Sequence, residues 1–364
     1  MVFVHELGHF VVARRNGIAA HEFGFGFPPR IFGVYKNEQG KWSLVKGGKN
    51  VETKNTIYSL NWFPIGGFVR IKGEDGSRKN DKDSFANKSP WSRSKVLIAG
   101  VAMNFILAWL LFSISFMLGT FQEVSDNDSQ NGKILINMVS KDSPSQKMGI
   151  MLGDEIIAGG VDDLIDFRKI EDVQSYINEN KGQEIILKIK RKKEILYLSG
   201  IPRAESVENQ GALGIGLSRV EIIRYGFFQS FYQGFLELLN VFLMMFITFK
   251  QLFLGNTSGV DVTGIIGIAV YTGQVIPLGI VQILRFAAIL SVNLGIINIF
   301  PFPALDGGRV LFIIIEKIKG SPVSEKMENI FHTAGFMILI LLMVFVTFKD
   351  LVRFEIFEKI ISIF

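Results

Sequence analysis

The chain has 364 residues, a formal net charge of +5 and no cysteine, so neither disulfides nor thiolate metal ligands are available. Only 20% of its residues are charged, 33 are phenylalanine, and the apolar residues are clumped, which argues against one soluble globule and predicts a multi-span membrane protein. The excess Lys and Arg residues lie beside the apolar runs without a basic–aromatic pattern, so we expect no nucleic-acid partner.

The chain begins with an apolar stretch that carries His5, Glu6 and His9. Histidines four residues apart project from the same face of a helix, about one turn from each other, and the glutamate lies one step round. In this HExxH arrangement two neutral imidazoles hold Zn²⁺ and the carboxylate acts as general base on the water. Polar groups in so apolar a helix are costly unless they have a function, so we predict a zinc site here.

This first stretch, residues 1–13, is shorter than the roughly 20 residues that cross a bilayer. Either the chain begins late and lacks the outer half of its first helix, or the helix enters the bilayer only partway; we prefer the first interpretation. The stretch has no basic start and no small-residue cleavage site, so it is not a cleavable signal peptide.

Residues 14–95 contain 16 Lys and Arg against 7 Asp and Glu, which predicts that they face the cytoplasm. Short strand-like runs alternate with turns, and residues 74–90 form a polar loop. The apolar run at residues 62–69 is expected to be a hairpin that dips toward the membrane, where protein or a cavity must satisfy its backbone. An ordinary surface hairpin is the alternative.

Four further segments are expected to lie in or on the membrane. Residues 96–118 contain no formal charge and form the clearest transmembrane helix, running from the cytoplasm outward, and further spans are expected at residues 280–300 and 332–349. Residues 225–254 carry polar side chains at helical spacing, so an interfacial amphipathic helix competes with a full span, and we favour the interfacial helix. Residues 255–279 are glycine-rich and expected to be irregular.

Residues 122–222 have the character of a soluble region inserted between the membrane segments. Residues 143–157 read SPSQKMGIMLGDEII and resemble the core of PDZ domains, with a later helix at 172–177 and a closing hairpin at 182–203. PDZ domains add an extended peptide to a sheet edge, so we expect a peptide partner at this region. The alternative is a PDZ shell that only packs on the membrane core.

Asp306 is the candidate third zinc ligand. Pro301 and Pro303 cannot continue a helix, so the chain must unwind there, and Gly307 and Gly308 allow close approach of the backbone. A carboxylate on such an irregular segment at membrane depth must face the protein interior or water. Two histidines and one aspartate leave the fourth zinc position open, as a catalytic site requires.

Four other polar residues are candidates near this site. Asn293 and Asn298 are predicted as substrate-binding residues; Asn298 would hydrogen-bond the substrate backbone or the oxyanion, or instead tie helices together. His21 follows the first helix in polar sequence and is expected at the surface. His332 begins a span and is expected at the interface rather than as a ligand.

The sequences HELGH, GGFVRIKGE, AGVAMN and NIFPFPALDGG, together with the PDZ-like core, resemble the site-2 protease family of intramembrane zinc metalloproteases. The resemblance covers nearly the whole chain and is strongest to the bacterial regulator-of-sigma-E type, the RIP metalloproteases. It implies zinc at His5, His9 and Asp306, Glu6 as the catalytic base, and residence in a bacterial inner membrane.

The resemblance also implies that single-pass membrane proteins are cleaved within the bilayer, often after a first cut outside. Anti-sigma-factor-like proteins and signal-peptide remnants are expected substrates. The hairpin would present the substrate as an added strand near Gly66, Gly67, Phe68, Val69 and Arg70.

The predicted architecture is therefore a multi-span α-helical membrane protein with about four transmembrane helices, a membrane-associated β-hairpin region and an inserted α+β PDZ domain. The predicted domains are a membrane core at 1–121, the PDZ-like domain at 122–222 and a second membrane core at 223–364. One rival function is a catalytically inactive relative that binds membrane clients, against which the complete HExxH and Asp306 set argues. Another is a transporter, against which the large insertion and the lack of internal repeats argue.

Overall fold

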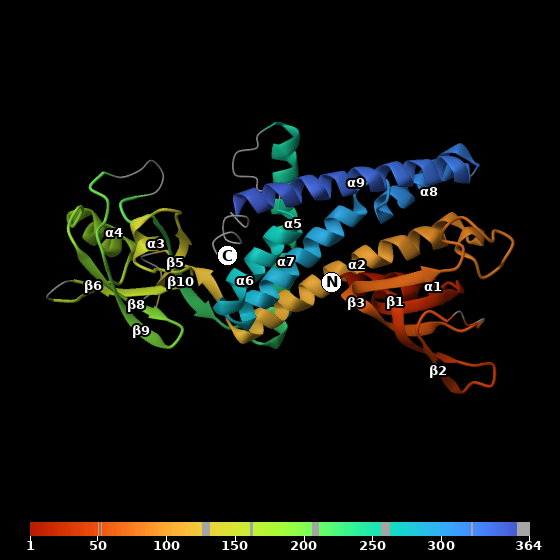
Figure 1. The fold of residues 1–364 in the computed structure, drawn as a ribbon, viewed down its shortest axis with the longest axis horizontal. Helices are drawn as coiled ribbons and strands as arrows, with labels where there is room; N and C mark the ends of the chain where they lie inside the picture. Colours follow the sequence, from red (N-terminus) through yellow and green to blue (C-terminus); the bar gives the residue numbers. More distant parts are fainter. Residues whose placement is uncertain are drawn as a thin grey trace, which may run out of the picture. The chain divides into compact units, whose positions relative to one another are not determined.

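The computed structural model describes residues 1–49, 51, 53–125, 132–160, 163–205, 211–255, 263–321 and 323–354. The chain divides into two compact units (Figure 1). The first unit consists of Met1–Ile114, Phe227–Gly273 and Ile283–Phe364, and the second consists of Ser115–Gly226 and Gln274–Gln282.

Among the described residues, four helices are long and apolar enough to cross a membrane. They are α2 (Pro90–Leu118), α5 (Phe227–Phe253), α7 (Ile280–Ile299) and α9 (Glu325–Arg353). The helices expected at residues 96–118, 280–300 and 332–349 are thus present. Two of them begin earlier than expected: Pro90 suits the first helical turn of α2, and the Ser324 hydroxyl accepts the Met327 N–H at the start of α9 (3.4 Å).

Small residues bring α2, α5 and α7 together in the first unit. Ala108 and Phe112 of α2 form a fully buried cluster with Ala288 and Val292 of α7, and Leu238 of α5 packs against it. Without a hydrophobic driving force between helices in lipid, such close packing is the main attraction between them. This cluster aligns α7 so that its C-terminal end leads into the Pro301–Pro303 segment.

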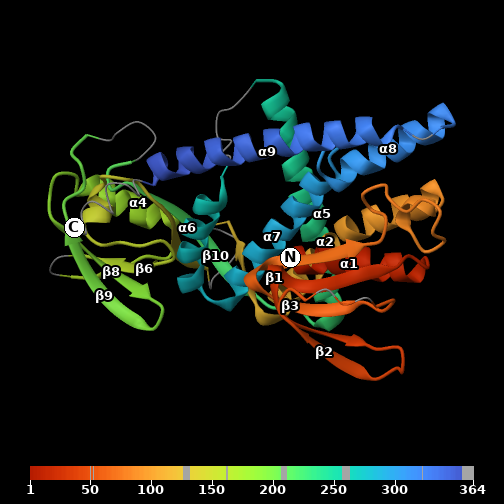
Figure 2. The same cartoon turned by 45° about the vertical axis from the view of Figure 1, so that its right-hand side comes forward.

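A three-stranded sheet lies beside the first helix, α1 (Val2–Arg15), in both views (Figures 1 and 2). Its strands are β1 (Ala20–Lys36), β2 (Trp42–Lys46) and β3 (Ile57–Ile71), in the order β2-β1-β3. Phe23 of β1 is paired with both Tyr58 and Val69 of β3, so two parts of β3 flank this part of β1, one on each side. The last part of β3 therefore lies at an edge of the sheet as far as the described strands show.

This arrangement changes the interpretation of residues 62–69. They do not form a separate hairpin; they belong to β3, whose partner β1 lies about forty residues earlier in the chain. Aromatic contacts fasten the ribbon to α1: the Phe3 and Phe23 ring centroids are 5.1 Å apart, and Phe10 stacks on Phe23 at 4.8 Å. The pairing is long-range, so the local pattern of turn residues could not reveal it.

Two helices appear where irregular chain was expected. Residues Ile265–Val275 form α6, followed by a short 3-10 turn, η2 (Ile276–Leu278), so the expectation for 255–279 is wrong in this part; residues 256–262 lie outside the described residues. Asp306 is the first residue of α8 (Asp306–Lys319) rather than part of an irregular segment. The irregular chain ends at Leu305, because Gly307 and Gly308 fit the first turn of this helix.

The contacts of α5 bear on whether it crosses the membrane. Just before α5, the Tyr225 N–H donates to the Phe116 carbonyl near the end of α2 (3.2 Å). After α5, the Gly264 and Gly267 N–H groups donate to Asp350 Oδ2, near the end of α9 (both 2.9 Å). The starts of α2 and α9 lie on one side, since Arg93 of α2 pairs with Glu316 of α8, which directly precedes α9 (2.7 Å).

The segment that contains α5 and ends at Gly264 therefore begins and ends on the side where α2 and α9 end. If α5 crossed completely, residues 254–264, eleven in all, would have to cross back, whereas a helical crossing takes about 20 residues. The length and composition of α5 suffice for a span, but these contacts favour the interfacial helix.

In the described part of the second unit, seven strands form one sheet, accompanied by the helices α3 and α4. Its strands run in the order β4-β10-β5-β6-β8-β9, with β7 paired to β6, and the apolar core includes Ile136, Val173 and Leu187. The elements are β4 (Thr120–Glu123), β5 (Lys133–Val139), α3 (Pro144–Lys147), β6 (Glu155–Gly159), β7 (Ile165–Asp166), α4 (Ile170–Glu179), β8 (Ile185–Arg191), β9 (Glu194–Gly200) and β10 (Ile215–Ile223). The helix at 172–177 and the hairpin at 182–203 have counterparts in α4 and in β8–β9; the PDZ identity stays a prediction.

Candidate metal centre

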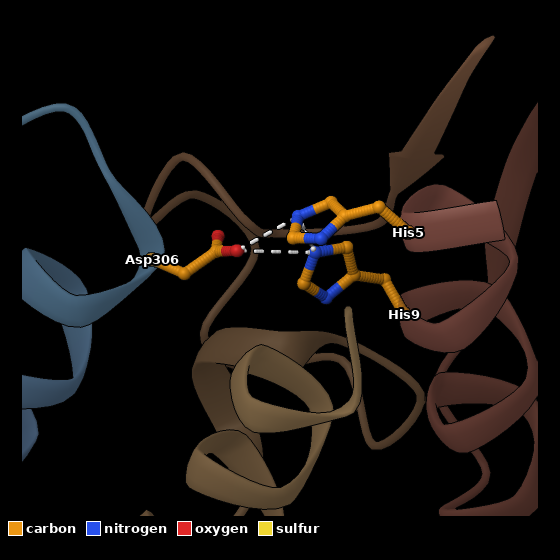
Figure 3. A group of neighbouring side chains, drawn as sticks. All are labelled: His5, His9 and Asp306. Atoms are coloured by element: carbon orange, nitrogen blue, oxygen red, sulfur yellow. Dashed lines mark hydrogen bonds and ion pairs between the residues drawn. The ribbon is translucent and has the colours of Figure 1, made fainter. Parts of the chain in front are cut away.

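Three side chains from opposite ends of the sequence converge on one point in the first unit. His5 and His9 project from the same face of α1, and Asp306 reaches them from the start of α8 (Figure 3). The two Nε2 atoms are 3.0 Å apart, and Asp306 Oδ2 lies 3.0 Å from His5 Nε2 and 3.3 Å from His9 Nε2. Both imidazoles are buried, so the cluster is shielded from bulk solvent.

The second ring nitrogen of each histidine sets its protonation. His9 Nδ1 lies 2.8 Å from the Val96 carbonyl, which can only accept, so this nitrogen carries the proton and Nε2 keeps a free lone pair. His5 Nδ1 lies 3.1 Å from Asn104 Nδ2, while Asn104 Oδ1 is buried without a hydrogen-bond partner in the described part of the chain. If the Asn104 amide is turned over, which exchanges its oxygen and nitrogen and gives the buried oxygen a partner, this oxygen accepts from a protonated Nδ1 and His5 also presents a bare Nε2 to the cluster.

The donor set fits a zinc ion. Two imidazole lone pairs and a carboxylate oxygen point at one another, and Asp306 Oδ2 has no hydrogen-bond partner within the described part of the chain. The lone pairs of these three ligand atoms repel one another unless a cation lies between them. Their separations of 3.0 to 3.3 Å match the roughly 3.3 Å between ligands in tetrahedral zinc sites. Three protein ligands leave one position for water or substrate, as in catalytic zinc sites.

Glycines on α1 and α2 allow these two helices to approach each other closely. A Cβ at Gly8 would overlap the Ala99 carbonyl, and a Cβ at Gly100 would overlap His9 Nε2 and come within 2.8 Å of His5 Cε1. Helix α2 therefore passes directly against the metal-binding nitrogens. Any larger residue at position 100 would occupy the space of the site itself.

The segment before Asp306 is held by contacts on both sides. A Cβ at Gly307 would overlap the Ile299 carbonyl, and one at Gly308 would overlap the Phe302 carbonyl, which confirms that these glycines permit close backbone approach. Ala304 adopts a left-handed conformation (φ +73°), and its N–H donates to His332 Nδ1 (2.9 Å). His332 thus supports the segment that presents Asp306 and is not part of the metal cluster.

Glu6 lies between the histidines and the edge of the sheet. Its Oε2 accepts the Val69 N–H (3.2 Å), so this amide of β3 points toward α1 and not into the strand pairing. The predicted strand Gly66–Arg70 is therefore adjacent to the HExxH helix. Its glycines allow the contact, because a Cβ at Gly66 would lie 2.9 Å from Val2 Cγ1 and one at Gly67 would lie 2.9 Å from Phe3 Cδ2.

The remaining candidates lie in different places. The Asn298 amide is 3.5 Å from His5 Nε2, so this residue borders the cluster. Asn293 does not belong to the cluster, and its Oδ1 is buried without a hydrogen-bond partner among the described residues. His21 does not belong to the cluster and lines a cavity with Arg70 and Arg78; burial and the nearby cations, first Arg78, lower its pKa.

Three groups that shape the site were not predicted from the sequence to be functional: Asn104, the Val96 carbonyl and Gly100. A polar amide in a span without charged residues is a signal that could have singled out Asn104. The other two leave no signal, because a backbone carbonyl and a missing side chain acquire their roles only through packing.

Comparisons with known proteins cover both halves of this site. The sequence model described as Peptidase family M50 matches residues 1–342. The chain is 33% identical to a protein of Clostridium perfringens named as a predicted zinc metalloprotease, over 97% of this chain and 95% of the relative. A similarly named protein of Clostridium acetobutylicum is 31% identical over 97% of this chain and 94% of its own length. The Regulator of sigma-W protease RasP of Bacillus subtilis is 29% identical over 97% of this chain and 96% of its own length.

Proposed function

This chain belongs to peptidase family M50, the site-2 protease family of zinc metalloproteases, and we propose that it cleaves single-pass membrane proteins within the bilayer. The observation that carries the proposal is the position of Glu6, beside the His5–His9–Asp306 cluster and hydrogen-bonded to the edge strand at Val69. The arrangement joins a hydrolytic centre to a backbone edge that an extended peptide can pair with.

In this proposal His5, His9 and Asp306 hold the zinc ion. When bound, zinc lowers the pKa of a water molecule toward neutrality and polarises the scissile carbonyl. Glu6, one residue from His5 and not a ligand, would accept a proton from the attacking water and deliver it to the leaving amine. The buried surroundings of the two histidines limit bulk water, so hydrolysis is confined to this point.

The substrate would bind as an added strand along Gly66, Gly67, Phe68, Val69 and Arg70. Helical amides are already hydrogen-bonded, so a transmembrane substrate must unwind before it can be cut, and pairing with a strand edge compensates its freed backbone groups. Asn298, 3.5 Å from His5 Nε2, would hydrogen-bond the substrate backbone or the oxyanion. Asn293 lacks a comparable contact and is the weaker candidate.

The name of the Bacillus subtilis relative associates it with regulation of a sigma factor. By analogy we propose anti-sigma-factor-like membrane proteins or signal-peptide remnants as substrates, in a bacterial inner membrane. A peptide partner at the PDZ-like region is supported by β10. Its residues Val220–Ile223 pair with β4, whereas Ile215–Ser218 have no second strand partner among the described strands, and α4 contacts this strand.

The rival hypothesis is an inactive client-binding protein that uses only its PDZ-like region and groove. A tagged single-span substrate is produced in cells with the wild-type chain, with Glu6→Gln, or with Glu38→Gln, an exposed acidic control in the turn after β1. We expect a cleavage product with the wild type and the control, and none with Glu6→Gln at equal expression. If Glu6→Gln produces the same product, or no version does, the protease proposal fails and client binding becomes the better hypothesis.

A further inference from the structure

An ion pair joins the helix that carries Asp306 to the turn that follows the edge strand. Arg309, in the first turn of α8, donates through Nη1 to Glu74 Oε1, just past the end of β3. We propose that Glu74 and Arg309 are positioning residues that hold the metal ligand in register with the substrate-binding edge. The inference rests on the proposed function, because it concerns how that site is aligned.

The pair completes a ring of contacts around the site. From Glu6 the ring runs through the Val69 N–H into β3 and to Glu74, then through Arg309 to Asp306, which closes on the two histidines of α1. Arg309 follows Asp306 by three residues, so both side chains leave the same side of α8. A displacement of the turn after β3 is therefore transmitted directly to the ligand carboxylate.

Apolar packing also connects these elements but does not define their register. Ile71 at the end of β3 and Ile313 of α8 share one buried cluster, and such contacts tolerate sliding because the hydrophobic effect has no direction. The charged hydrogen bond between Glu74 and Arg309 has a preferred distance and direction. It therefore supplies the alignment that the apolar cluster lacks.

The position of the pair separates its effect on stability from its effect on turnover. Both side chains are about a third exposed (31% and 33%), and both line two cavities of about 330 and 500 Å³, the second bordered by β3 residues from Phe68 onward. Pairs in contact with water contribute little to stability. A shift of about 1 Å at a catalytic site, in contrast, can reduce the rate by about a hundredfold.

A second ion pair provides a matched control. Arg93 of α2 binds both carboxylate oxygens of Glu316 at the other end of α8 (2.7 Å each), with side-chain exposures of 16% and 21%. It fastens the same helix from the side of α2, and its ion pair includes no residue of β3. Loss of this pair tests whether any weakening of α8 suffices to impair the enzyme.

The experiment measures kcat, KM and zinc content of the detergent-purified full chain with a single-span substrate. Variants are Arg309→Met, Glu74→Gln, Arg309→Lys and the control Arg93→Met. We expect Arg309→Met and Glu74→Gln to lower kcat about 10- to 100-fold with KM within about twofold and zinc retained. Arg309→Lys should recover most of the rate, since one N–H donor suffices for the contact, and Arg93→Met should stay within about threefold of the wild type.

Three results would overturn the inference while the wild type remains active: unchanged kcat in Arg309→Met and Glu74→Gln, equal losses in Arg93→Met, or loss of zinc in proportion to kcat. The last would make the pair a structural support of the ligand and not a device for alignment. An inactive wild type would instead refute the proposed function, so the two failures are distinguishable.

Discussion

Single residues decide which nitrogen atoms are offered to the metal. The Val96 carbonyl and the Asn104 amide each engage an imidazole Nδ1, and the absent side chain of Gly100 leaves room for both Nε2 atoms. Such outer partners fix the tautomer and direction of a ligating histidine. All three groups lie on α2, so the position of this helix determines how the histidines of the HExxH helix are oriented.

Gly100→Ala should displace the histidine rings, because the added Cβ would overlap His9 Nε2. We expect the zinc affinity of the purified protein to fall at least about tenfold, measured by competition with a chromophoric chelator. Gly273→Ala in α6 is the control, since its Cβ would meet nothing within 4 Å. Equal zinc affinity in both variants would show that the packing at Gly100 is not required.

Asn104→Leu removes the amide that orients His5 while retaining a side chain of similar size. Without a partner at Nδ1 the ring is free to rotate or to change tautomer, so zinc affinity should fall about 10- to 100-fold. Asn104→Asp, which keeps an acceptor for the Nδ1 proton, should retain more affinity. The idea fails if the leucine variant binds zinc as tightly as the wild type.

At the scale of elements, one side chain from α9 starts α6. Asp350 is buried, and its Oδ2 accepts the N–H groups of Gly264 and Gly267 at the beginning of α6. The first N–H groups of a helix lack partners within it, and an acidic side chain there satisfies them. This cap lies more than eighty residues further along the chain, so α6 depends on the position of α9.

Asp350→Leu should loosen the first turn of α6. Loss of a cap costs about 1 to 2 kcal/mol, so amide hydrogen exchange at residues 264–268 should accelerate roughly 5- to 30-fold, measured by mass spectrometry. Asp350→Asn keeps an oxygen acceptor and should show a smaller change. Unaltered exchange in the leucine variant would mean that α6 is held by packing alone.

At the scale of the whole molecule, the path of α5 sets the membrane topology. The contacts at Tyr225 and at Gly264 place both ends of the segment that contains α5 on the side where α2 and α9 end. If α5 is interfacial, the chain stays on that side of the membrane until α7 crosses back toward the metal centre. A crossing α5 would require a further crossing by eleven residues, which is too few for a helix.

The absence of cysteine in the sequence allows this topology to be tested by single-cysteine labelling in intact spheroplasts. Leu254→Cys, at a side chain that is 75% exposed, should react with an impermeant maleimide from the same side as Gly226→Cys. Lys79→Cys, in the polar loop after β3, should react only after permeabilisation. Reaction of Leu254→Cys together with Lys79→Cys would establish α5 as a complete span.

The sequence by itself determined the chemistry and most of the helices. The HExxH spacing needs only the helical repeat, and an uncharged run such as residues 96–118 has no stable alternative to a helix in lipid. The prolines and glycines around Asp306 likewise predicted a close backbone approach, because their constraints act locally. Family membership followed from these same motifs.

Only the tertiary structure decided which distant groups meet. The pairing of β1 with β3, the cap of α6 by Asp350 and the contact of Gly100 with His9 each join segments separated by tens of residues. Such contacts depend on how packed elements approach one another, and a sequence window cannot express this. The same holds for Glu74 and Arg309, two ordinary charged residues whose juxtaposition beside the site exists only because α8 packs against the end of β3.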